Sequence, residues 1–411
     1  MSVNVAVEVE LTTQIHTGRA EVIDVLAGRW QELCDGTRCA PFHRPEWIAA
    51  YLQVFESDSE VVLLTASAGE RLVAVLPLIR KQCWYSGVPM TKLTGAANVH
   101  SVRFDILRSA CPAGEASIQA LWQAIKRIPG WHVLEFPYFP QSGACANLLA
   151  QAGDDGYITR TFLLQDCPTL RMQTDADGRL TWLGGTSRHF RHELRRYARV
   201  LETEAGAKHK VTRWNYPEPR VLDEFFELEA AGWKGQGGSA IKCSPETRAF
   251  YETIARQGSE RGYFRLHSLE VNGKMAAGAF SVVAGDCFFP MKIAFSEALR
   301  RGGPGHILFN SILEECAGDG IPELFFGGAK DHYKELWTQE TLPHFKGLVF
   351  APGVRGRLAC QMRTKVFPVL SKLRQDLEER LKQRNKRKAE KSMQSKLGKS
   401  ADGAGSAHSQ E

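Results

Sequence analysis

The stretch Arg300-Arg301-Gly302-Gly303-Pro304-Gly305-His306-Ile307-Leu308-Phe309 leads from a predicted β-meander into a predicted helix. Its glycines let backbone N–H groups approach a ligand closely, and the positive end of a helix dipole favours negative charge. Pro304 suits the first turn of the helix, because the amide proton that it lacks would have no partner there. The stretch therefore predicts a phosphate-binding turn, although an ordinary strand–turn–helix connection has the same pattern. The predicted ligand-binding residues are Arg300, Arg301, Gly303, Gly305 and His306.

The bulk composition is typical of a globular protein and bounds its class. The chain has 411 residues, enough for two domains, with 43% hydrophobic and 24% charged residues. No run approaches the roughly 20 apolar residues of a membrane span, and the first residues lack the pattern of a signal peptide. The ten cysteines are scattered without metal-ligand spacing. We therefore expect reduced thiols, no bound metal and a cytoplasmic location.

Positive charge is concentrated at the C-terminal end of the chain. From Met362 onward the chain carries 13 Lys and Arg against 6 Asp and Glu, whereas residues 1–361 carry 39 against 40. Four leucines in this region fall at helical spacing, namely Leu370, Leu373, Leu377 and Leu381. We predict a basic amphipathic helical segment over 356–390 and a disordered tail over 391–411. Such a segment can contact an anionic membrane peripherally, or it can serve only to keep the chain in solution.

A weak internal repeat divides the rest of the chain. Pro45–Tyr51 and Pro245–Tyr251 are identical at four of seven positions, and each begins a predicted helix. Each is preceded by another helix pattern and followed by two strands joined by a tight turn, at Gly69-Glu70 and at Asn272-Gly273. This shared order predicts two similar α/β halves. The predicted divisions are an N-terminal extension over 1–20, a first half over 21–170 and a second half over 171–355.

An arginine-rich helix is predicted over Arg188–Glu204, after N-capping hydroxyl groups. Its arginines at 188, 191, 195 and 199 share one face, and such a stripe repels itself unless an anion is near. We therefore assign Arg191 and Arg195 to substrate binding. Candidate ligands are a sugar acid, a phosphorylated or lipid-linked substrate, or RNA. A solvated helix face would have the same composition.

Several motifs together resemble the CelD-type, BioF2-like acetyltransferases, which belong to the GNAT superfamily and are related to the FemABX peptidyl transferases. The resemblance extends from about Phe42 to Phe350. Its motifs are Phe42-His43-Arg44-Pro45-Glu46-Trp47, the arginine-rich helix, Glu229-Ala230-Ala231-Gly232-Trp233-Lys234, Gly305 and Gly327-Gly328-Ala329-Lys330-Asp331-His332-Tyr333-Lys334-Glu335-Leu336-Trp337. It implies a mixed α/β fold of two tandem GNAT-like halves, each a mostly antiparallel sheet flanked by helices. It also implies acetyl-CoA or another acyl-CoA as co-substrate.

The resemblance implies direct acyl transfer to nitrogen or oxygen of a sugar, an amino sugar or an envelope or exopolysaccharide precursor. Such transfer needs a polarised thioester, a deprotonated nucleophile and a protonated leaving thiolate. We expect the thioester oxygen to meet a backbone N–H within Pro290–Ala294. The catalytic candidates are Tyr333 as proton donor, Lys334 near the oxyanion or an acidic acceptor, and Asp331 as base, with His332 and Glu229 as alternative bases. Trp233 and Lys234 are assigned to the acceptor pocket.

Two other functions stay open at this point. GNAT enzymes usually carry Arg/Gln-x-x-Gly-x-Gly/Ala at the pyrophosphate turn, and Pro304 departs from this pattern by removing one backbone donor. If the donor is aminoacyl-tRNA, as in the FemABX relatives, RNA is a partner of the chain. With any other donor we expect no nucleic-acid partner. A non-catalytic GNAT-like factor in polysaccharide synthesis at the membrane would bind no acyl-CoA.

Overall fold

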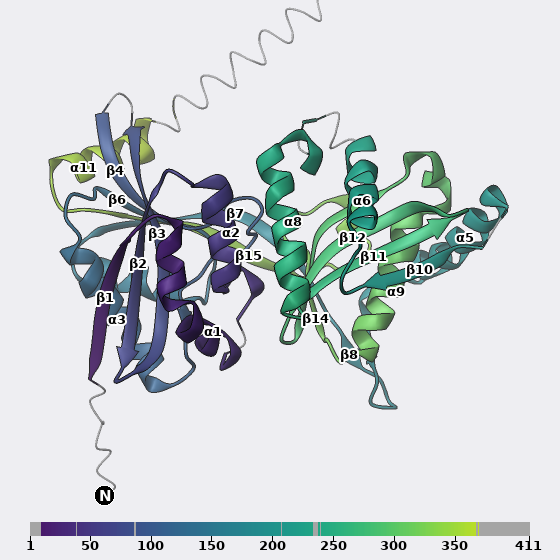
Figure 1. The fold of residues 1–411 in the computed structure, drawn as a ribbon, viewed down its shortest axis with the longest axis horizontal. Coiled ribbons are helices and arrows are strands. Elements are labelled where there is room, and N and C mark those ends of the chain that lie inside the picture. The colour runs from purple at the N-terminus through teal and green to yellow at the C-terminus, as the bar shows by residue number, and fades with distance from the viewer. Residues whose placement is uncertain are drawn as a thin grey trace, which may run out of the picture.

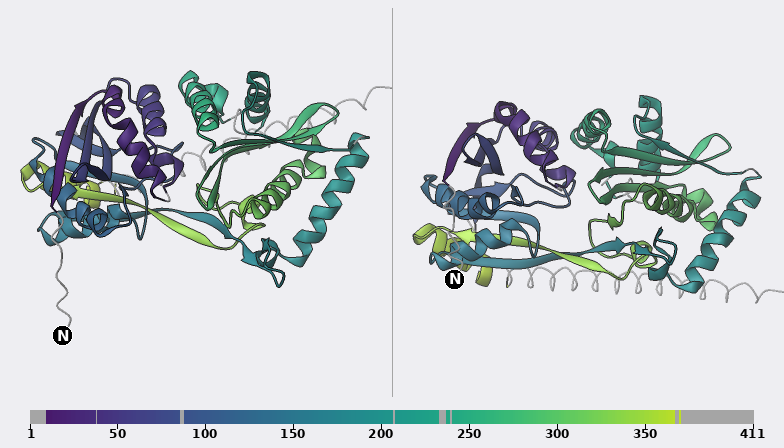
Figure 2. Two further views of the ribbon diagram at one scale, coloured as in Figure 1. Left: turned by 60° about the horizontal axis from the view of Figure 1, so that its bottom comes forward. Right: turned by 90° about the horizontal axis from the view of Figure 1, so that it is seen from below.

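The computed structural model describes residues 10–369 of the chain, apart from positions 38, 86–87, 207, 233–236, 239 and 367–368. The fold is mixed α/β, as predicted, and consists of two lobes that lie side by side (Figure 1). One large mixed sheet runs through both lobes, and helices flank it on both faces (Figure 2).

The first lobe is a sheet between two helical layers. Its strands are β1 (Leu11–Gly18), β2 (Glu60–Ala68), β3 (Arg71–Tyr85), β4 (Val88–Gly95), β5 (Leu107–Arg108) and β6 (Val133–Pro140). Its helices are η1 (Ala20–Leu26), α1 (Ala27–Asp35), η2 (Pro41–His43), α2 (Pro45–Phe55), α3 (Pro112–Arg127) and α4 (Ala144–Asp154). Alternate residues of the strands face opposite layers. Hence Leu63 packs with α1 and α2, whereas Leu64 packs with α3 and α4.

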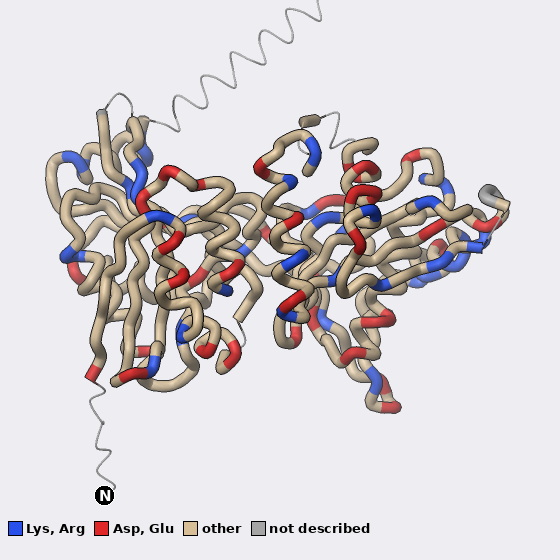
Figure 3. The backbone as a smooth tube through the Cα atoms, viewed as in Figure 1, with Lys and Arg blue, Asp and Glu red and all other residues tan. Residues whose placement is uncertain are grey.

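The second lobe repeats this arrangement. Its strands are β10 (Lys210–Trp214), β11 (Phe264–Val271), β12 (Lys274–Ala284), β13 (Cys287–Phe295) and β14 (Glu323–Phe325), beside a small hairpin of β8 (Gln173–Thr174) and β9 (Leu180–Thr181). Its helical segments are α5 (Arg188–Ala205), α6 (Pro219–Ala231), α8 (Pro245–Glu260), η5 (Glu297–Gly302), α9 (Pro304–Gly318) and α10 (His332–Glu335), with short turns η3 (Leu183–Gly185) and η4 (Ile241–Cys243). Helices α6 and α8 cover one face of the sheet, and α5 and α9 cover the other (Figure 2). Basic residues gather along α5 (Figure 3).

The predicted repeat is present in the fold. Helices α1 and α2 precede the β2–β3 hairpin, as α6 and α8 precede the β11–β12 hairpin. In the turn of the second hairpin Asn272 and Gly273 have φ of 52° and 71°, as a type I′ turn requires. Each lobe then continues with a strand, a helix and a parallel strand, β4–α3–β6 and β13–α9–β14. The two similar α/β halves are therefore confirmed.

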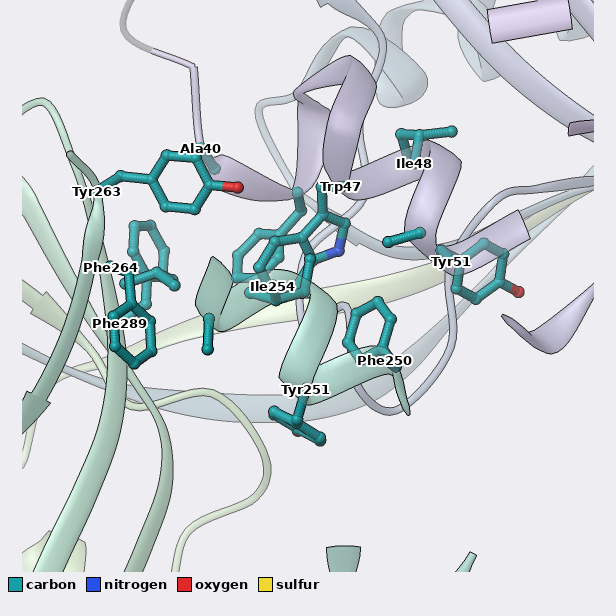
Figure 4. Packing of buried hydrophobic residues seen from close by; sticks show 14 of the residues in the cluster. Ala40, Trp47, Ile48, Tyr51, Phe250, Tyr251, Ile254, Tyr263, Phe264 and Phe289 are labelled. Carbon is teal, nitrogen blue, oxygen red and sulfur yellow. The ribbon is translucent and has the colours of Figure 1, made fainter. Parts of the chain in front are cut away.

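The equivalent helices α2 and α8 pack against each other between the lobes (Figure 4). The fully buried Trp47 ring meets the Phe250 ring edge-on at 5.5 Å, and its indole N–H donates to Ser101 Oγ at 2.9 Å. Phe42 meets Phe289 of β13 edge-on at 5.3 Å. These contacts join the two lobes through one continuous hydrophobic core.

Two long strands tie the lobes together, and their pairing differs from the predicted division. Strand β15 (Thr341–Phe350) lies between β6 and β7 (Ile158–Arg171), although the sequence placed it in the second half. Strand β7 continues into the second lobe, where it pairs with β14 through Leu170↔Leu324. The predicted extension also contributes to the fold, because β1 pairs with β2 as an edge strand. Pairing between strands far apart in sequence leaves no local signal. The hydrophobic pattern of the sequence therefore predicted these strands but not their partners.

The described C-terminal residues pack on the first lobe. Helix α11 (Val354–Gln361) and the short π-helical segment η6 (Met362–Val366) form the beginning of the predicted amphipathic segment. Ala359 and Cys360 are buried against Met90, Val133 and Leu348. The predicted leucine stripe and the predicted tail lie outside the described residues. Among the residues that the structure describes, no helix has the length and apolar character to cross a membrane.

Candidate functional site

The parallel pair β13–β14 separates after its first residues. Pairing is confined to Cys287↔Glu323 and Phe288↔Leu324, and no other described strand replaces β14 along the remainder of β13. In the first lobe the equivalent pair β4–β6 is joined through Lys92–Thr94, close to the end of β4. In the second lobe the part of β13 from Phe289 to Phe295 therefore continues beyond its pairing with β14.

A β-bulge lies within this diverging part of β13. Phe280 of β12 pairs with Lys292, and the next residue, Ser281, pairs with Pro290, so Met291 is the extra residue. A bulge bends its strand and redirects the residues beside it. Pro290 cannot donate a hydrogen bond from its own backbone. Within the predicted segment Pro290–Ala294, the donors for a carbonyl oxygen are therefore the amides from Met291 onward.

Lys292 points from the bulge towards the helical layer of α6 and α8. Its Nζ lies 3.9 Å from Glu229 Oε1 and 5.7 Å from the centre of the Tyr251 ring. Glu229 is buried, and its Oε2 accepts a hydrogen bond from the backbone N–H of Ile241 at 2.7 Å. The carboxylate thus links β13 to the end of the connection between α6 and α8. Trp233 and Lys234, which we assigned to the acceptor pocket, belong to this connection but lie outside the described residues.

A histidine of the first lobe reaches the same region. His100 Nδ1 lies 3.3 Å from Tyr251 Oη, and its ring stacks on Phe55 with centroids 5.4 Å apart. Burial, followed by the charge of Lys292, lowers the pKa of His100 to about 4, so the imidazole is neutral at pH 7. The junction of the lobes therefore brings Glu229, Lys292 and His100 near the diverging strand. The sequence analysis did not identify His100 or Lys292.

The glycine-rich turn lies at the start of α9, where α5 covers it. Gly303 has φ of 53°, and a Cβ atom there would stand 2.6 Å from the Tyr197 ring. A Cβ atom at Gly302 would stand 2.9 Å from Leu201. Both glycines are buried, so they allow the close approach of α5 to the turn. This packing gives Gly303 a structural role, and its assignment as a cofactor contact stays a prediction.

His306 is held between two tyrosine rings. Its ring stacks on Tyr197 at 5.6 Å and on Tyr333 at 4.7 Å between centroids. Burial lowers the pKa of His306 to about 4, so it brings no positive charge to the turn at pH 7. Tyr333 donates a hydrogen bond from its hydroxyl to the Gly305 carbonyl at 3.2 Å. Burial raises the pKa of Tyr333 well above its usual value, so the hydroxyl stays protonated.

The neighbouring catalytic candidates hold the loop after β14. Lys334 Nζ donates to the carbonyls of Gly327 at 3.0 Å and Ala329 at 2.9 Å, and it lies 3.3 Å from the Asp331 carboxylate. Asp331 caps α10 by accepting the backbone N–H of Lys334 at 2.9 Å. Gly327 and Gly328 have φ of 60° and 64°, a conformation that suits glycine. Lys334 and Asp331 therefore hold the loop that follows β14, the strand that separates from β13.

The two arginines before the turn are exposed. Arg300 Nη1 lies 3.7 Å from the Glu297 carboxylate, and both residues belong to η5. Arg301 is likewise exposed, at the point where η5 meets the glycines. Their guanidinium groups therefore lie beside the start of α9 in contact with solvent, and they are the positive charges that the sequence predicted there.

A cavity of about 560 Å³ lies between α5 and α9, and we call it the α5–α9 groove. Its lining residues are Arg191, Leu194, Arg195, Ala198, His209, Ile307, Asn310 and Ser311. Arg191 and Arg195, assigned to substrate binding, thus face α9 immediately after its glycine-rich turn. The turn, the diverging strand and the groove all belong to the second lobe. No group of His, Cys, Asp and Glu among the described residues could hold a metal ion.

The packing of Tyr197 on Gly303 gives a first prediction. Gly303→Ala combines the strain of a left-handed residue, about 1–2 kcal/mol, with displacement of the Tyr197 ring, about 1–3 kcal/mol. Gly320→Ala is the matched control, because Gly320 has φ of 71° but nothing within 4 Å of the added Cβ. Chemical denaturation should show a larger loss of unfolding free energy for Gly303→Ala. Equal losses would contradict the close contact between α5 and the turn.

Comparison with known proteins agrees with this arrangement. Residues 188–335 match the family described as acetyltransferase (GNAT) domain, a range that contains α5, the glycine-rich turn and α10. A search of curated proteins gives no significant match.

Solved structures share the fold over most of the chain. FemX aligns with a TM-score of 0.53 and 10% identity, over 78% of this chain and 96% of its own. The C-terminal domain (DUF2156) of an Agrobacterium fabrum protein assigned as a lysylphosphatidylglycerol synthetase aligns with a TM-score of 0.51 and 14% identity, over 83% of this chain and 95% of its own. Residues 188–335 of this chain are therefore similar to the GNAT acetyltransferase domain, and the fold over most of the chain is similar to that of FemX.

Proposed function

We propose that the chain transfers an acyl group from acetyl-CoA or another acyl-CoA directly to an amine or hydroxyl group. The acceptor class is a sugar, an amino sugar or another envelope or exopolysaccharide precursor. The observation that carries the proposal is the separation of β13 from β14 beside the glycine-rich turn. A thioester can enter between the two strands there, while the phosphates of the donor lie near the start of α9.

The backbone beside the bulge on β13 activates the thioester in the proposed reaction. Backbone N–H groups after Pro290 polarise the thioester carbonyl and stabilise the oxyanion of the tetrahedral intermediate. Fixed amides of a strand need no reorganisation during the reaction, which favours the charge-separated state. Lys334 and Asp331 act as positioning residues in this proposal, because they fix the loop opposite the bulge.

Tyr333 is the proposed proton donor to the leaving thiolate. Its hydroxyl is protonated at neutral pH, and its hydrogen bond to the Gly305 carbonyl directs it towards the start of α9. On collapse of the intermediate, the carbon–sulfur bond breaks and the proton passes from Tyr333 Oη to the sulfur of CoA. The proton released by the attacking amine or hydroxyl has to leave on the acceptor side.

The junction of the lobes is the proposed acceptor side. His100 can accept a proton through its neutral imidazole, while Lys292 can hold an acidic group of the acceptor. Glu229 is paired with Lys292 and bonded to Ile241, so its first role is to position the connection that carries Trp233 and Lys234.

A FemABX-like transfer from aminoacyl-tRNA is the second candidate. The two-lobed fold shared with FemX and the arginine face of α5 favour it. A tRNA donor would bind with a strong dependence on salt, because phosphate contacts release counterions. A non-catalytic factor with peripheral membrane contact through the basic tail is the third candidate, and it would bind neither donor.

Titration calorimetry of the full chain with acetyl-CoA and free CoA tests the donor. We expect binding of about 1 µM to 1 mM, in the usual range for enzyme substrates. Gly305→Glu should abolish it by adding negative charge at the turn. Gly305→Ala is the matched control, because its Cβ would stand 3.4 Å from Phe295, within tolerable contact. Absence of binding to folded protein at millimolar acetyl-CoA would contradict the acyl-CoA proposal.

Release of the CoA thiol tests the role of Tyr333. Tyr333→Phe should leave acetyl-CoA affinity unchanged and lower kcat by about 10²-fold or more, the usual contribution of a general acid. Loss of its bond to Gly305 should cost about 1 kcal/mol of unfolding free energy. Tyr263→Phe is the matched control, since Tyr263 is buried in the other helical layer and no described residue bonds its hydroxyl. An unchanged kcat in Tyr333→Phe would exclude Tyr333 as the proton donor.

A further inference from the structure

The connection between β4 and β5 lies against both lobes. Ser101 Oγ accepts the indole N–H of Trp47 at 2.9 Å, which fixes the connection to α2. A Cβ atom on Gly327 would stand 3.1 Å from the Val102 side chain, so the connection also contacts the loop after β14. The next residue, Arg103, is therefore held at the junction of the lobes, close to the strand that separates from β13.

Arg103 has no partner for its positive charge. Its Nε is buried without a hydrogen-bond partner, although the residue as a whole is partly exposed. Among the residues that the structure describes, no carboxylate forms an ion pair with Arg103, and no acceptor takes a hydrogen bond from it. Because an unpaired charge at a partly buried position is costly, its presence points to a ligand.

The groups around Arg103 carry no compensating charge at pH 7. Its charge acts on four groups from different elements, namely His43, His344, Cys167 and Cys287. Burial, followed by the charge of Arg103, lowers the pKa of His43 to about 3, and burial lowers the pKa of His344 to about 4. Burial raises the pKa of Cys167 to about 11 and the pKa of Cys287 to about 12. Both imidazoles and both thiols are therefore neutral.

Three acidic residues of the adjoining segments do not neutralise Arg103 either. Asp105 accepts backbone N–H groups at the start of α4, at 2.8 and 3.1 Å. Glu323 lies 3.2 Å from the guanidinium of Arg171. Asp166 is exposed and lies on the face of β7 opposite to Cys167, because successive residues of a strand alternate.

The chemistry of the site favours a carboxylate. A guanidinium group presents parallel N–H donors that match the two oxygens of a carboxylate. One cation among neutral groups balances a single negative charge, whereas a phosphate monoester carries about −1.5 to −2 at pH 7. The Nε2 atoms of His43 and His344 are also buried without partners, and a sugar hydroxyl or an ordered water can satisfy them.

We propose that Arg103 binds a carboxylate of the acceptor, which makes the acceptor an acidic sugar of the uronic acid kind. In assigning the carboxylate to the acceptor, this proposal rests on the proposed function. Lys292 already lies 3.9 Å from Glu229, whereas Arg103 is unpaired. His100 precedes Arg103 by three residues, so their backbone positions are at most roughly 11 Å apart. A disaccharide can therefore place its carboxylate at Arg103 and its nucleophile near His100.

Calorimetry of the full chain, without an acyl donor, tests the site with matched ligands. The first probe is a disaccharide of glucosamine and glucuronic acid. The second probe is the same disaccharide with its carboxyl group reduced to an alcohol, and the third carries a phosphate ester on that alcohol. We expect the first probe to bind at least about tenfold more tightly than the second, as a bidentate pair with a charged group implies.

Variants of Arg103 assign this difference to its side chain. Arg103→Gln should remove the difference between the first two probes. Arg103→Lys should retain only part of it, because lysine keeps the charge but cannot pair with both oxygens in one plane. Arg127→Gln is the matched control, since it removes the same charge from the exposed surface of α3, on the other face of the first-lobe sheet. The control should keep the difference within about twofold of that in the unaltered chain.

Four results would overturn the carboxylate site. The first is equal affinity of the first two probes for the unaltered chain, which includes no binding of either. The second is a difference that persists in Arg103→Gln, and the third is its loss in Arg127→Gln as well. The fourth is tighter binding of the phosphorylated probe than of the first probe through Arg103.

The acetyl-CoA titration separates this proposal from the proposed function. Binding of the first probe that depends on Arg103, without any binding of acetyl-CoA, contradicts the acyl-CoA donor only. Binding of acetyl-CoA, together with equal affinity for the first two probes, contradicts the carboxylate site only.

Discussion

The limited pairing between β13 and β14 is the constraint on which the second lobe depends. In the first lobe the parallel pair β4–β6 is joined over Lys92–Thr94, to within one residue of the end of β4. After Phe288 and Leu324 the second pair separates. Beyond this point other contacts must hold the two strands apart. The bulge at Met291 bends β13, and Lys334 binds the glycine loop that follows β14. The cost of leaving strand edges without a partner suggests a functional reason for the separation.

The start of α9 is fixed from both sides by aromatic packing. Tyr197 of α5 and Tyr333 of α10 enclose the His306 ring, and the glycines admit α5 at close range. The histidine is neutral, so positive charge near the turn comes from the helix dipole, from Arg300 and Arg301, and from the arginines of the groove. The positive side chains near the turn therefore lie on η5 and α5 rather than among the glycines.

Much of the fold could be predicted from the sequence, because its evidence is local. Most helices and strands, and both lobes, could be located from three local patterns. These are helix periodicity, the Asn272-Gly273 turn and the repeated Pro-Glu pair at helix starts. The partners of β15 and β7 could not be predicted, since pairing across long sequence separation leaves no local pattern. For the site, the sequence identified the turn and the arginine face. It could not show that Tyr197 occupies the space above Gly303, or that folding brings His100 to Lys292, because both depend on tertiary contact.

The central claim is that the donor lies between the diverging strand and the start of α9. Hydrogen–deuterium exchange of the full chain, with and without saturating CoA, tests it most directly, because exchange reports protection of individual backbone segments. The account predicts slower exchange in Phe289–Phe295 and in the first turns of α9, with little change in the equivalent strand and helix, β4 and α3. Protection confined to the first lobe, or CoA binding without protection in either predicted segment, would contradict it.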